Sequence, residues 1–222
     1  MSTSSKSSKI FQQKAQLRTL LRQLIKDLTP ENKHIQSQKV TSHLLNDNAR
    51  FKAAKHIGIF LTKQNDVNTI PLIEAIIDNP AIFADKHLYA PHIQLNAKND
   101  KPPEIEFFQL KNLFSYHDPL MNRDKLVIRE SLVKADPSVF DLMLVPGLGF
   151  NSHSAMGRIS RIGRGKGYYD DLLRQLNKCY TIGVGFNEQF FPFNETLKGV
   201  EIPVDEKMDV DLDEFLCAKI IK

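Results

Sequence analysis

A stretch of alternating glycines and basic side chains stands out in this 222-residue chain. It consists of Arg161, Ile162, Gly163, Arg164, Gly165, Lys166, Gly167, Tyr168, Tyr169 and Asp170. The three glycines allow backbone N–H groups to turn toward a ligand and approach it closely. The three basic side chains attract anions, and no acidic residue occurs between Asp141 and Asp170. These features predict a site for a polyphosphate, such as that of a nucleotide.

The stretch differs from two common nucleotide motifs. A glycine follows Lys166 where the P-loop has Ser or Thr, and the G-x-G-x-G spacing is not that of the dinucleotide fingerprint. The same residues could instead form a basic surface loop or contact the backbone of a nucleic acid. If polyphosphate binds with Mg²⁺, the ion needs one or two carboxylates. Asp170 directly follows the glycines, and the acidic segment 205–214 is the other source of such groups.

Helices and strands are predicted to alternate around this stretch. A strand over residues 141–145 precedes it and a helix over residues 168–177 follows it. This order places the glycines at the carboxyl edge of a sheet, where α/β folds bind ligands. The other predicted elements are helices over 9–28, 30–45 and 69–77, and strands over 56–61, 86–90, 105–110, 180–186 and 215–221.

These elements predict a single α/β domain. Near-continuous apolar strands that alternate with helices are typical of a mainly parallel sheet flanked by helices on both faces. An N-terminal helical pair and a glycine-rich phosphate loop complete the predicted fold. Thr29 is suited to cap the second helix of the pair, with Pro30 in its first turn. Residues 94–134 are poorly patterned, so we expect loops over one edge.

Composition excludes several classes of protein. With 41% apolar and 25% charged residues and a net charge of +4, the chain is neither fibrous nor disordered, nor marked as a nucleic-acid binder. Cys179 and Cys217 lie far apart, which excludes a disulfide scaffold and indicates a reducing compartment. No apolar run approaches the roughly 20 residues that span a bilayer, so we expect a soluble protein.

The N-terminus allows two interpretations. Residues 1–26 contain serines and basic residues without any acid, which is compatible with a mitochondrial transit peptide. The alternative is a disordered tail over residues 1–9 that leads into an amphipathic helix, with residues 10–222 forming the domain.

Two motifs of the chain resemble those of the 5-formyltetrahydrofolate cyclo-ligase family, also called 5,10-methenyltetrahydrofolate synthetases. They are V-P-G-L-G-F at residues 145–150 and R-I-G-R-G-K-G-Y-Y-D at residues 161–170. The family pattern is V-P-G-x-x-F, a short loop, and R-[LI]-G-x-G-x-G-Y-Y-D. Here the loop has ten residues, 151–160, and is longer than is typical. The resemblance also covers K-A-Q-L-R at 14–18, F-L-T-K-Q-N-D at 60–66, and I-P-V at 202–204 with Asp209.

The resemblance implies roles for the matching residues. ATP binding is implied for Lys14, Arg18, Arg161, Ile162, Gly163, Arg164, Gly165, Lys166, Gly167, Tyr168 and Tyr169. Folate binding is implied for Leu61, Asp66, Arg164, Gly165, Lys166, Gly167 and Tyr168. Arg164 and Lys166 would be the catalytic residues. Asp170 and Asp209 would bind Mg²⁺, with Asp205 and Asp211 as alternatives to Asp209. Tyr89 and Tyr116 are either stacking residues for the folate or ordinary packing residues.

The implied reaction is an ATP-dependent ring closure. The γ-phosphoryl group activates the formyl oxygen on N5 of 5-formyltetrahydrofolate, and N10 then attacks to give 5,10-methenyltetrahydrofolate. The expected partners are small molecules, a reduced folate and ATP, without nucleic acid or membrane, and we expect a monomer. If Lys14 and Arg18 hold phosphate, a transit peptide cannot extend beyond them, which favours the cytoplasm over mitochondria. The competing hypotheses are a nucleic-acid-binding module and a different small-molecule kinase or ligase.

Overall fold

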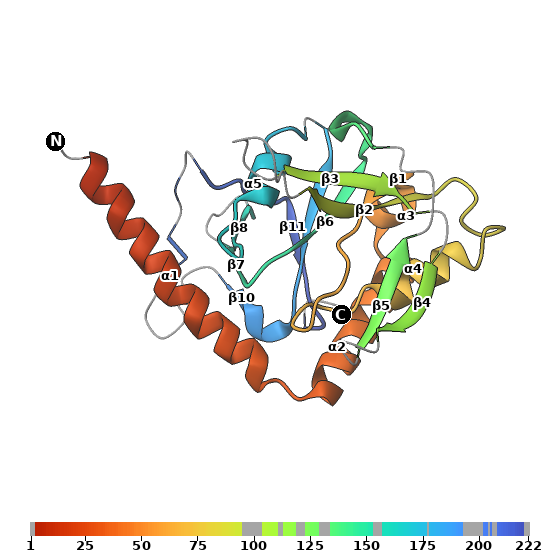
Figure 1. Cartoon of the computed structure of the whole chain (residues 1–222), viewed down its shortest axis with the longest axis horizontal. Helices are drawn as coiled ribbons and strands as arrows, with labels where there is room; N and C mark the ends of the chain where they lie inside the picture. Colours follow the sequence, from red (N-terminus) through yellow and green to blue (C-terminus); the bar gives the residue numbers. More distant parts are fainter. Residues whose placement is uncertain are drawn as a thin grey trace.

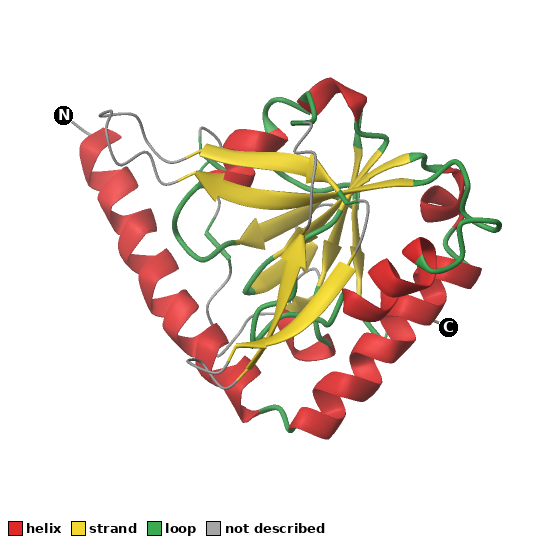
Figure 2. Ribbon diagram, turned by 45° about the vertical axis from the view of Figure 1, so that its right-hand side comes forward, coloured by secondary structure: helices red, strands yellow, loops and turns green. Residues whose placement is uncertain are grey.

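The computed structural model describes residues 3–94, 104–110, 113–118, 123–128, 134–152, 157–176, 178–192, 202–203, 205 and 208–219. Its centre is a six-stranded sheet with the order β11-β9-β6-β1-β2-β3 (Figures 1 and 2). The strands are β1 (His56–Gly58), β2 (His87–Gln94), β3 (Glu104–Gln109), β6 (Leu142–Pro146), β9 (Tyr180–Val184) and β11 (Glu214–Leu216). Neighbouring strands are parallel except for β2 and β3. The predicted, mainly parallel sheet is therefore confirmed.

The described residues form five α-helices. These are α1 (Thr3–Asp27), α2 (Pro30–Asn46), α3 (Ala49–Ala53), α4 (Ile70–Ile77) and α5 (Tyr168–Leu173). The first two are the predicted N-terminal pair, although α1 begins within the residues predicted as a tail. Thr29 caps α2, because its Oγ1 accepts a hydrogen bond of 3.1 Å from the backbone N of Asn32. Within the described residues, no helix is both long and apolar enough to cross a membrane.

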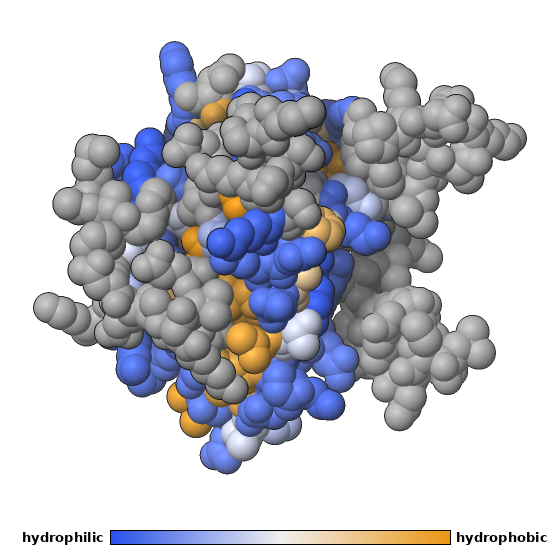
Figure 3. Space-filling model, turned by 90° about the vertical axis from the view of Figure 1, so that its left-hand side faces the viewer, coloured by the Kyte–Doolittle hydropathy of each residue, from blue (hydrophilic) through white to orange (hydrophobic). Residues whose placement is uncertain are grey.

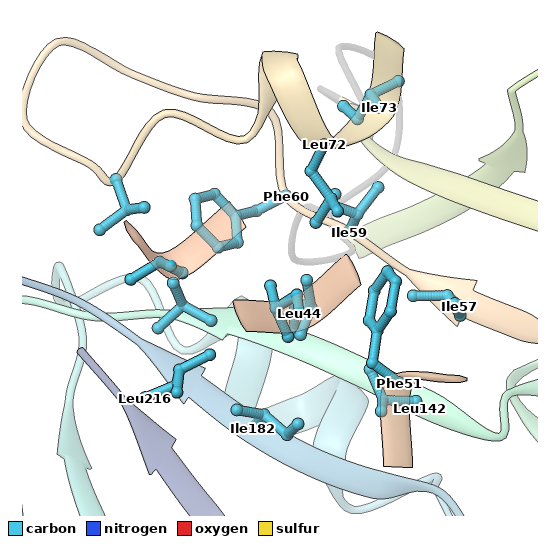
Figure 4. Close-up of a cluster of buried hydrophobic side chains, with 14 of the residues drawn as sticks. Leu44, Phe51, Ile57, Ile59, Phe60, Leu72, Ile73, Leu142, Ile182 and Leu216 are labelled. Carbon is cyan, nitrogen blue, oxygen red and sulfur yellow. The ribbon is translucent and has the colours of Figure 1, made fainter. Parts of the chain in front are cut away.

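Buried apolar side chains cover both faces of the sheet. On one face, residues of α1 to α4 pack against the strands, with Phe51 of α3 between Leu44 of α2 and Ile57 of β1 (Figure 4). On the other face, Leu172 of α5 belongs to a cluster that includes Phe150. Helices thus flank both faces, as predicted.

A second, three-stranded sheet carries the start of the glycine stretch. Its order is β10-β7-β8, in which β7 (Gly149–Ser152) is antiparallel to β8 (Ile159–Ile162) and parallel to β10 (Phe190–Phe191). The long loop expected after Phe150 is therefore largely a hairpin, and its residues 153–156 lie outside the described residues. Phe150 pairs with Arg161, so the chain leaves β8 at Ile162 and runs directly into the glycines.

Residues 94–134 are not only loops, and that prediction was wrong. The antiparallel strands β4 (Leu113–Asp118) and β5 (Arg123–Ile128) form a separate two-stranded sheet. A hairpin of this kind depends on cross-strand pairs, which a search for helical or buried-strand periodicity does not detect. The short helix α3 was also not predicted.

Several predicted elements are shorter in the structure, among them the strand expected over 180–186, which ends at Val184. The strand expected over 56–61 ends at Gly58, although the N–H of Ile59 still donates to the carbonyl of Tyr89 at 2.8 Å. The helix expected over 168–177 ends at Leu173, because Gln175 and Leu176 donate to carbonyls only three residues earlier, which tightens the last turn. The strand expected over 215–221 corresponds to β11, which ends at Leu216; residues 217–219 are not in a strand, and residues 220–222 lie outside the described residues.

Candidate active site

A cavity of about 830 Å³ opens at the carboxyl edge of the parallel strands. Its walls come from α1, the loop after β1, the ends of β2 and β6, and the glycine stretch between β8 and α5. The residues with a principal assignment to ATP, folate or metal all line this cavity: Lys14, Arg18, Leu61, Asp66, Arg161, Ile162, Gly163, Arg164, Gly165, Lys166, Gly167, Tyr168, Tyr169, Asp170 and Asp209. Of the two alternatives to Asp209, Asp205 lines the cavity and Asp211 does not. The structure thus brings together segments that are almost 200 residues apart.

The glycines between β8 and α5 are needed for the shape of the loop. Gly165 and Gly167 have φ angles of 98° and 77°, in the left-handed region that other residues rarely adopt. Gly163 is needed for space, since a Cβ there would lie 2.7 Å from Nη1 of Arg161. Gly167 also accepts the first hydrogen bond of α5 on its carbonyl, from the N–H of Asp171 at 3.0 Å.

The loop is fastened to both sides of the cavity. On the side of α1, Nε of Arg18 donates to the carbonyl of Gly163 at 3.0 Å. On the side of the β1 loop, Nη2 of Arg164 donates to Oδ1 of Asp66 at 2.6 Å. The glycine loop therefore lies between the cations of α1 and the segment predicted to contact folate. Lys166 is exposed and lines the cavity, with its ammonium group available to an anion.

Arg161 makes contacts that differ from those of its neighbours. Its side chain is only 3% exposed, and Nη2 donates to Oδ1 of Asp170 at 2.8 Å. Nη1 donates to the carbonyl of Pro146 at 3.3 Å, and the guanidinium lies 5.8 Å from the ring centre of Tyr169. Nε has no hydrogen-bond partner among the described residues. These contacts orient Asp170, whereas direct contact of Arg161 with phosphate stays a prediction.

Lys14 and Asp209 form an ion pair across the cavity. Nζ of Lys14 lies 2.6 Å from Oδ1 of Asp209 and also contacts Oδ2. The N–H of Asp205 donates to Oδ2 of Asp209 at 2.7 Å, which holds the carboxylate in place. A cation predicted to bind phosphate is thus paired with a carboxylate predicted to bind metal. Among the described residues, no group of three or more His, Cys, Asp or Glu side chains is arranged to hold a metal ion.

Burial shifts the pKa of three groups in the cavity, Asp66, Tyr169 and Arg18. It raises the pKa of the Asp66 carboxyl above its ordinary value, and the attraction of Arg164 only partly offsets this effect. Burial also raises the pKa of the Tyr169 phenol, so this group stays protonated at neutral pH. Arg18 has a pKa lowered by burial and, next, by Arg22, but an arginine remains charged under such conditions.

Sequence reasoning missed several residues of the cavity. Ile10, Phe11 and Met208 also line it, as do His92 and Ile105. Helical spacing from Lys14 could have identified the first two, because residues three and four positions apart share a helix face. Met208 has no comparable signal in the sequence.

Tyr89 does not stack in the cavity. Its hydroxyl lies 2.9 Å from Nδ1 of His56, and its ring packs edge-on against Phe140 on the other side of the sheet. It is therefore a packing residue, one of the two interpretations that the sequence left open. The side chain of Tyr116 lies outside the described residues.

Together, the fold and the cavity define an α/β protein with a cation-rich ligand pocket at the carboxyl edge of its parallel strands. The sequence model of the 5-formyltetrahydrofolate cyclo-ligase family matches residues 10–218. The chain therefore belongs to this family and is an enzyme, as its resemblance to the family indicated.

Three relatives illustrate the similarity. The mouse (Mus musculus) 5-formyltetrahydrofolate cyclo-ligase is 31% identical over 206 residues, which cover 90% of this chain and 91% of the mouse protein. A mitochondrial 5-formyltetrahydrofolate cyclo-ligase of Arabidopsis thaliana is 28% identical over 183 residues, or 79% and 64% of the two chains. The solved structure of a 5,10-methenyltetrahydrofolate synthetase from Mycoplasma pneumoniae has a TM-score of 0.64 and 22% identity, and covers 92% of this chain and 98% of its own. This last similarity shows the fold alone.

Proposed function

We propose that the chain catalyses the ATP-dependent cyclisation of 5-formyltetrahydrofolate to 5,10-methenyltetrahydrofolate, with release of ADP and phosphate. Membership of the family supports this reaction. The structural observation that supports it most directly is the position of the glycine loop, which is fastened to Arg18 on one side and to Asp66 on the other. A loop in that position can contact ATP and the folate at the same time.

The chemistry requires two steps. The γ-phosphorus of ATP forms a bond to the N5-formyl oxygen while its bond to the β-phosphate oxygen breaks, which releases ADP. N10 of the folate then attacks the activated formyl carbon, the carbon–oxygen bond breaks, and phosphate leaves as N10 loses its proton. Phosphoryl transfer depends mainly on positioning and on neutralising charge, so a protein nucleophile is not needed.

The residues of the cavity suit these tasks. Lys14 and Arg18 would hold the phosphate chain from α1, and Lys166 would contact it from the glycine loop. Arg164 would lie between the two ligands, where its guanidinium would neutralise the charge of the transferred group. Leu61 and Asp66, on the loop after β1, would hold the reduced folate ring. Because N10 and the formyl carbon belong to one molecule, the second step is intramolecular.

The carboxylates of the cavity also fit a magnesium ion. Mg²⁺ takes one or two carboxylates together with phosphate oxygens and water, so two acids are sufficient. Asp170 and Asp209 line the cavity beside the cations and would hold the ion. The ion would neutralise the negative charge of the phosphate oxygens. Arg161 would keep Asp170 oriented, while Lys14 would exchange its contact with Asp209 for a contact with phosphate.

The proposed partners and location follow from the same contacts. The substrates would be small molecules, without nucleic acid or membrane, and the protein would act as a monomer. Cleavage of a presequence beyond Lys14 would remove part of the cavity wall, which favours a cytoplasmic enzyme over a mitochondrial one. Imaging of a C-terminal fluorescent fusion in the source cells tests the location, and a mitochondrial pattern would overturn it.

A direct assay tests the activity. Purified protein with MgATP and 5-formyltetrahydrofolate should produce the near-ultraviolet absorbance of the methenyl product, with ADP and phosphate formed in equal amounts. Neither the absorbance change nor ADP should appear when the folate is omitted. Absence of both changes in the complete mixture would refute the proposed reaction. Steep, salt-dependent binding to RNA without ATP turnover would favour the nucleic-acid-binding hypothesis instead.

A further inference from the structure

Two exposed apolar side chains line the cavity, and they come from segments far apart in the sequence. Phe11 of α1 is 69% exposed, and Met208 of the segment before β11 is 60% exposed. Both line the cavity, as does Ile10, which is partly buried. The other large apolar side chains exposed within the described residues, Ile35, Ile82 and Val139, do not line it. Exposed apolar surface that gathers at the mouth of a pocket is typical of a ligand contact.

Phe11 continues the inward-facing stripe of α1. Leu17 and Leu21 of that stripe are fully buried against the sheet, and Lys14 follows toward the N-terminus. Phe11 lies three residues before Lys14 and seven before Arg18, a spacing that puts all three side chains on one face of the helix. The first turns of α1 extend past the body of the sheets (Figure 1). Within the described part of the chain, the stripe is therefore no longer buried where it passes the cavity, and Phe11 is exposed there.

The apolar side chains lie directly beside the ion pair that crosses the cavity. Met208 immediately precedes Asp209, which contacts Lys14, and Phe11 is one helical turn beyond Lys14. The segments that carry the ion pair, α1 and the residues before β11, thus place the cation of Lys14 next to the apolar side chains of Phe11 and Met208. The face of the molecule on which α1 lies shows apolar side chains among hydrophilic ones (Figure 3). A ligand that matches this order carries anionic groups at one end and a flat apolar ring at the other.

We propose that Phe11 and Met208 form the slot that binds the adenine ring of ATP. This inference rests on the proposed function, which supplies ATP as the ligand. At 1.5 Å per residue, Phe11 lies about 10 Å from Arg18 along α1, a length over which the ribose and phosphate chain can extend. The folate is assigned to the opposite end of the cavity, where Asp66 lies beyond the glycine loop. An aromatic ring can stack on the base, and a thioether makes favourable contact with the edge of an aromatic ring.

The proposal separates binding of the base from binding of the phosphates. Phe11→Ala should raise the Kd for MgATP about tenfold to a hundredfold, the range expected when a base loses an aromatic partner. The Kd of the same variant for magnesium tripolyphosphate, which has no base, should stay at the wild-type value. Met208→Ala should raise the Kd for MgATP by a smaller factor, and it should also leave the Kd for magnesium tripolyphosphate unchanged. Ile82→Ala is the matched control, because Ile82 is 73% exposed and lies outside the cavity.

A second variant reports the contact directly. The chain contains no tryptophan, so Phe11→Trp creates a single indole fluorophore at the proposed slot. Its emission should be quenched when MgATP binds and should stay unchanged with magnesium tripolyphosphate. The variant should retain tight binding of ATP, because an indole also stacks on a base.

The possible results distinguish the two proposals. If wild-type protein binds neither ATP nor tripolyphosphate, the proposed function fails, and the slot fails with it. If wild-type protein binds both, the proposed slot is refuted, without affecting the proposed function, by any of three results for Phe11→Ala. These results are binding of ATP with the wild-type Kd, equally weakened binding of ATP and tripolyphosphate, and weakened binding of the folate alone.

Discussion

The guanidinium of Arg161 donates to Oδ1 of Asp170 at 2.8 Å, and both groups are largely shielded from water. One lies on β8 and the other in the first turn of α5, so this ion pair spans the glycine loop and connects its two ends. Arg161 thereby acts on the cavity through Asp170, and it also holds the end of β6 through the carbonyl of Pro146.

Arg161→Lys should weaken this connection while keeping the positive charge. An ammonium group cannot reproduce the planar geometry by which one guanidinium contacts a carboxylate and a carbonyl together. We expect the free energy of unfolding to fall by about 1–3 kcal/mol and the Mg²⁺ concentration for half-maximal activity to rise several-fold. Urea unfolding and magnesium titration of the activity measure these two effects.

Arg158→Lys is the control for this prediction. Arg158 pairs with Asp213 at 2.8 Å, but the two side chains are 54% and 29% exposed, and Arg158 lies outside the cavity. Exposed pairs contribute less than about 1 kcal/mol, so this variant should unfold almost like the wild type. Similar losses in both variants would show that the Arg161 pair has no special structural role.

The ion pair between Lys14 and Asp209 makes a second prediction. Lys14→Met or Asp209→Asn alone leaves the other, partly buried, group without its partner, and each should lower the free energy of unfolding by about 1–3 kcal/mol. The double variant should lose less than the sum, because no unpaired charge remains. Lys14→Met should also raise the KM for MgATP. Urea unfolding of all four proteins gives the coupling energy, and strictly additive losses would contradict the pair.

The sequence predicted the members of the cavity better than it predicted their contacts. Lys14, Asp66 and Asp209 were assigned through family motifs, and a parallel sheet brings the ends of distant segments to one edge. Without the family motifs, the sequence pointed only to the glycine stretch, to Asp170 and, without choosing a residue, to the acidic segment 205–214. That Arg161 is buried could not be read from its charge, because its burial depends on the hairpin formed by β7 and β8.

The apolar side chains at the cavity mouth show the same limit. Helical periodicity places Phe11 on the buried stripe of α1, and a core residue is the natural expectation. Its 69% exposure depends on where the helix passes the edge of the sheets, which is a property of the tertiary fold. The strands β4 and β5 were missed for a related reason, since each is stabilised by pairing with the other.

The raised pKa of Asp66 predicts a pH effect on folate binding. The carboxylate form accepts the hydrogen bond from Arg164, so protonation should weaken the loop contact at a pH above the ordinary range of aspartate. We expect kcat/KM for the folate to fall on the acid side with such a shifted pKa. Asp66→Asn should abolish this acid limb, and an unchanged limb in that variant would assign it to another group.

Stability should show the complementary effect of Asp66. Because the pKa is higher in the folded protein than in the unfolded chain, the contribution of this group is fully present below the unfolded pKa. It is lost as the pH rises through the folded pKa, where the buried carboxyl ionises. Wild-type protein should therefore lose stability relative to Asp66→Asn over this range. Urea unfolding of both proteins on either side of it checks the sign.

Gly165→Ala tests whether the shape of the glycine loop serves binding. The φ angle of 98° disfavours an alanine, and its Cβ would lie 3.4 Å from the guanidinium of Arg18. We expect a loss of roughly 1–2 kcal/mol in stability and at least a tenfold rise in the Kd for MgATP, measured by calorimetry. Gly157→Ala is the matched control, because Gly157 has a φ of 74°, open space around it, and a position outside the cavity. It should lose similar stability and bind MgATP normally; equal weakening of binding in both variants would mean that the loop affects ATP only through general stability.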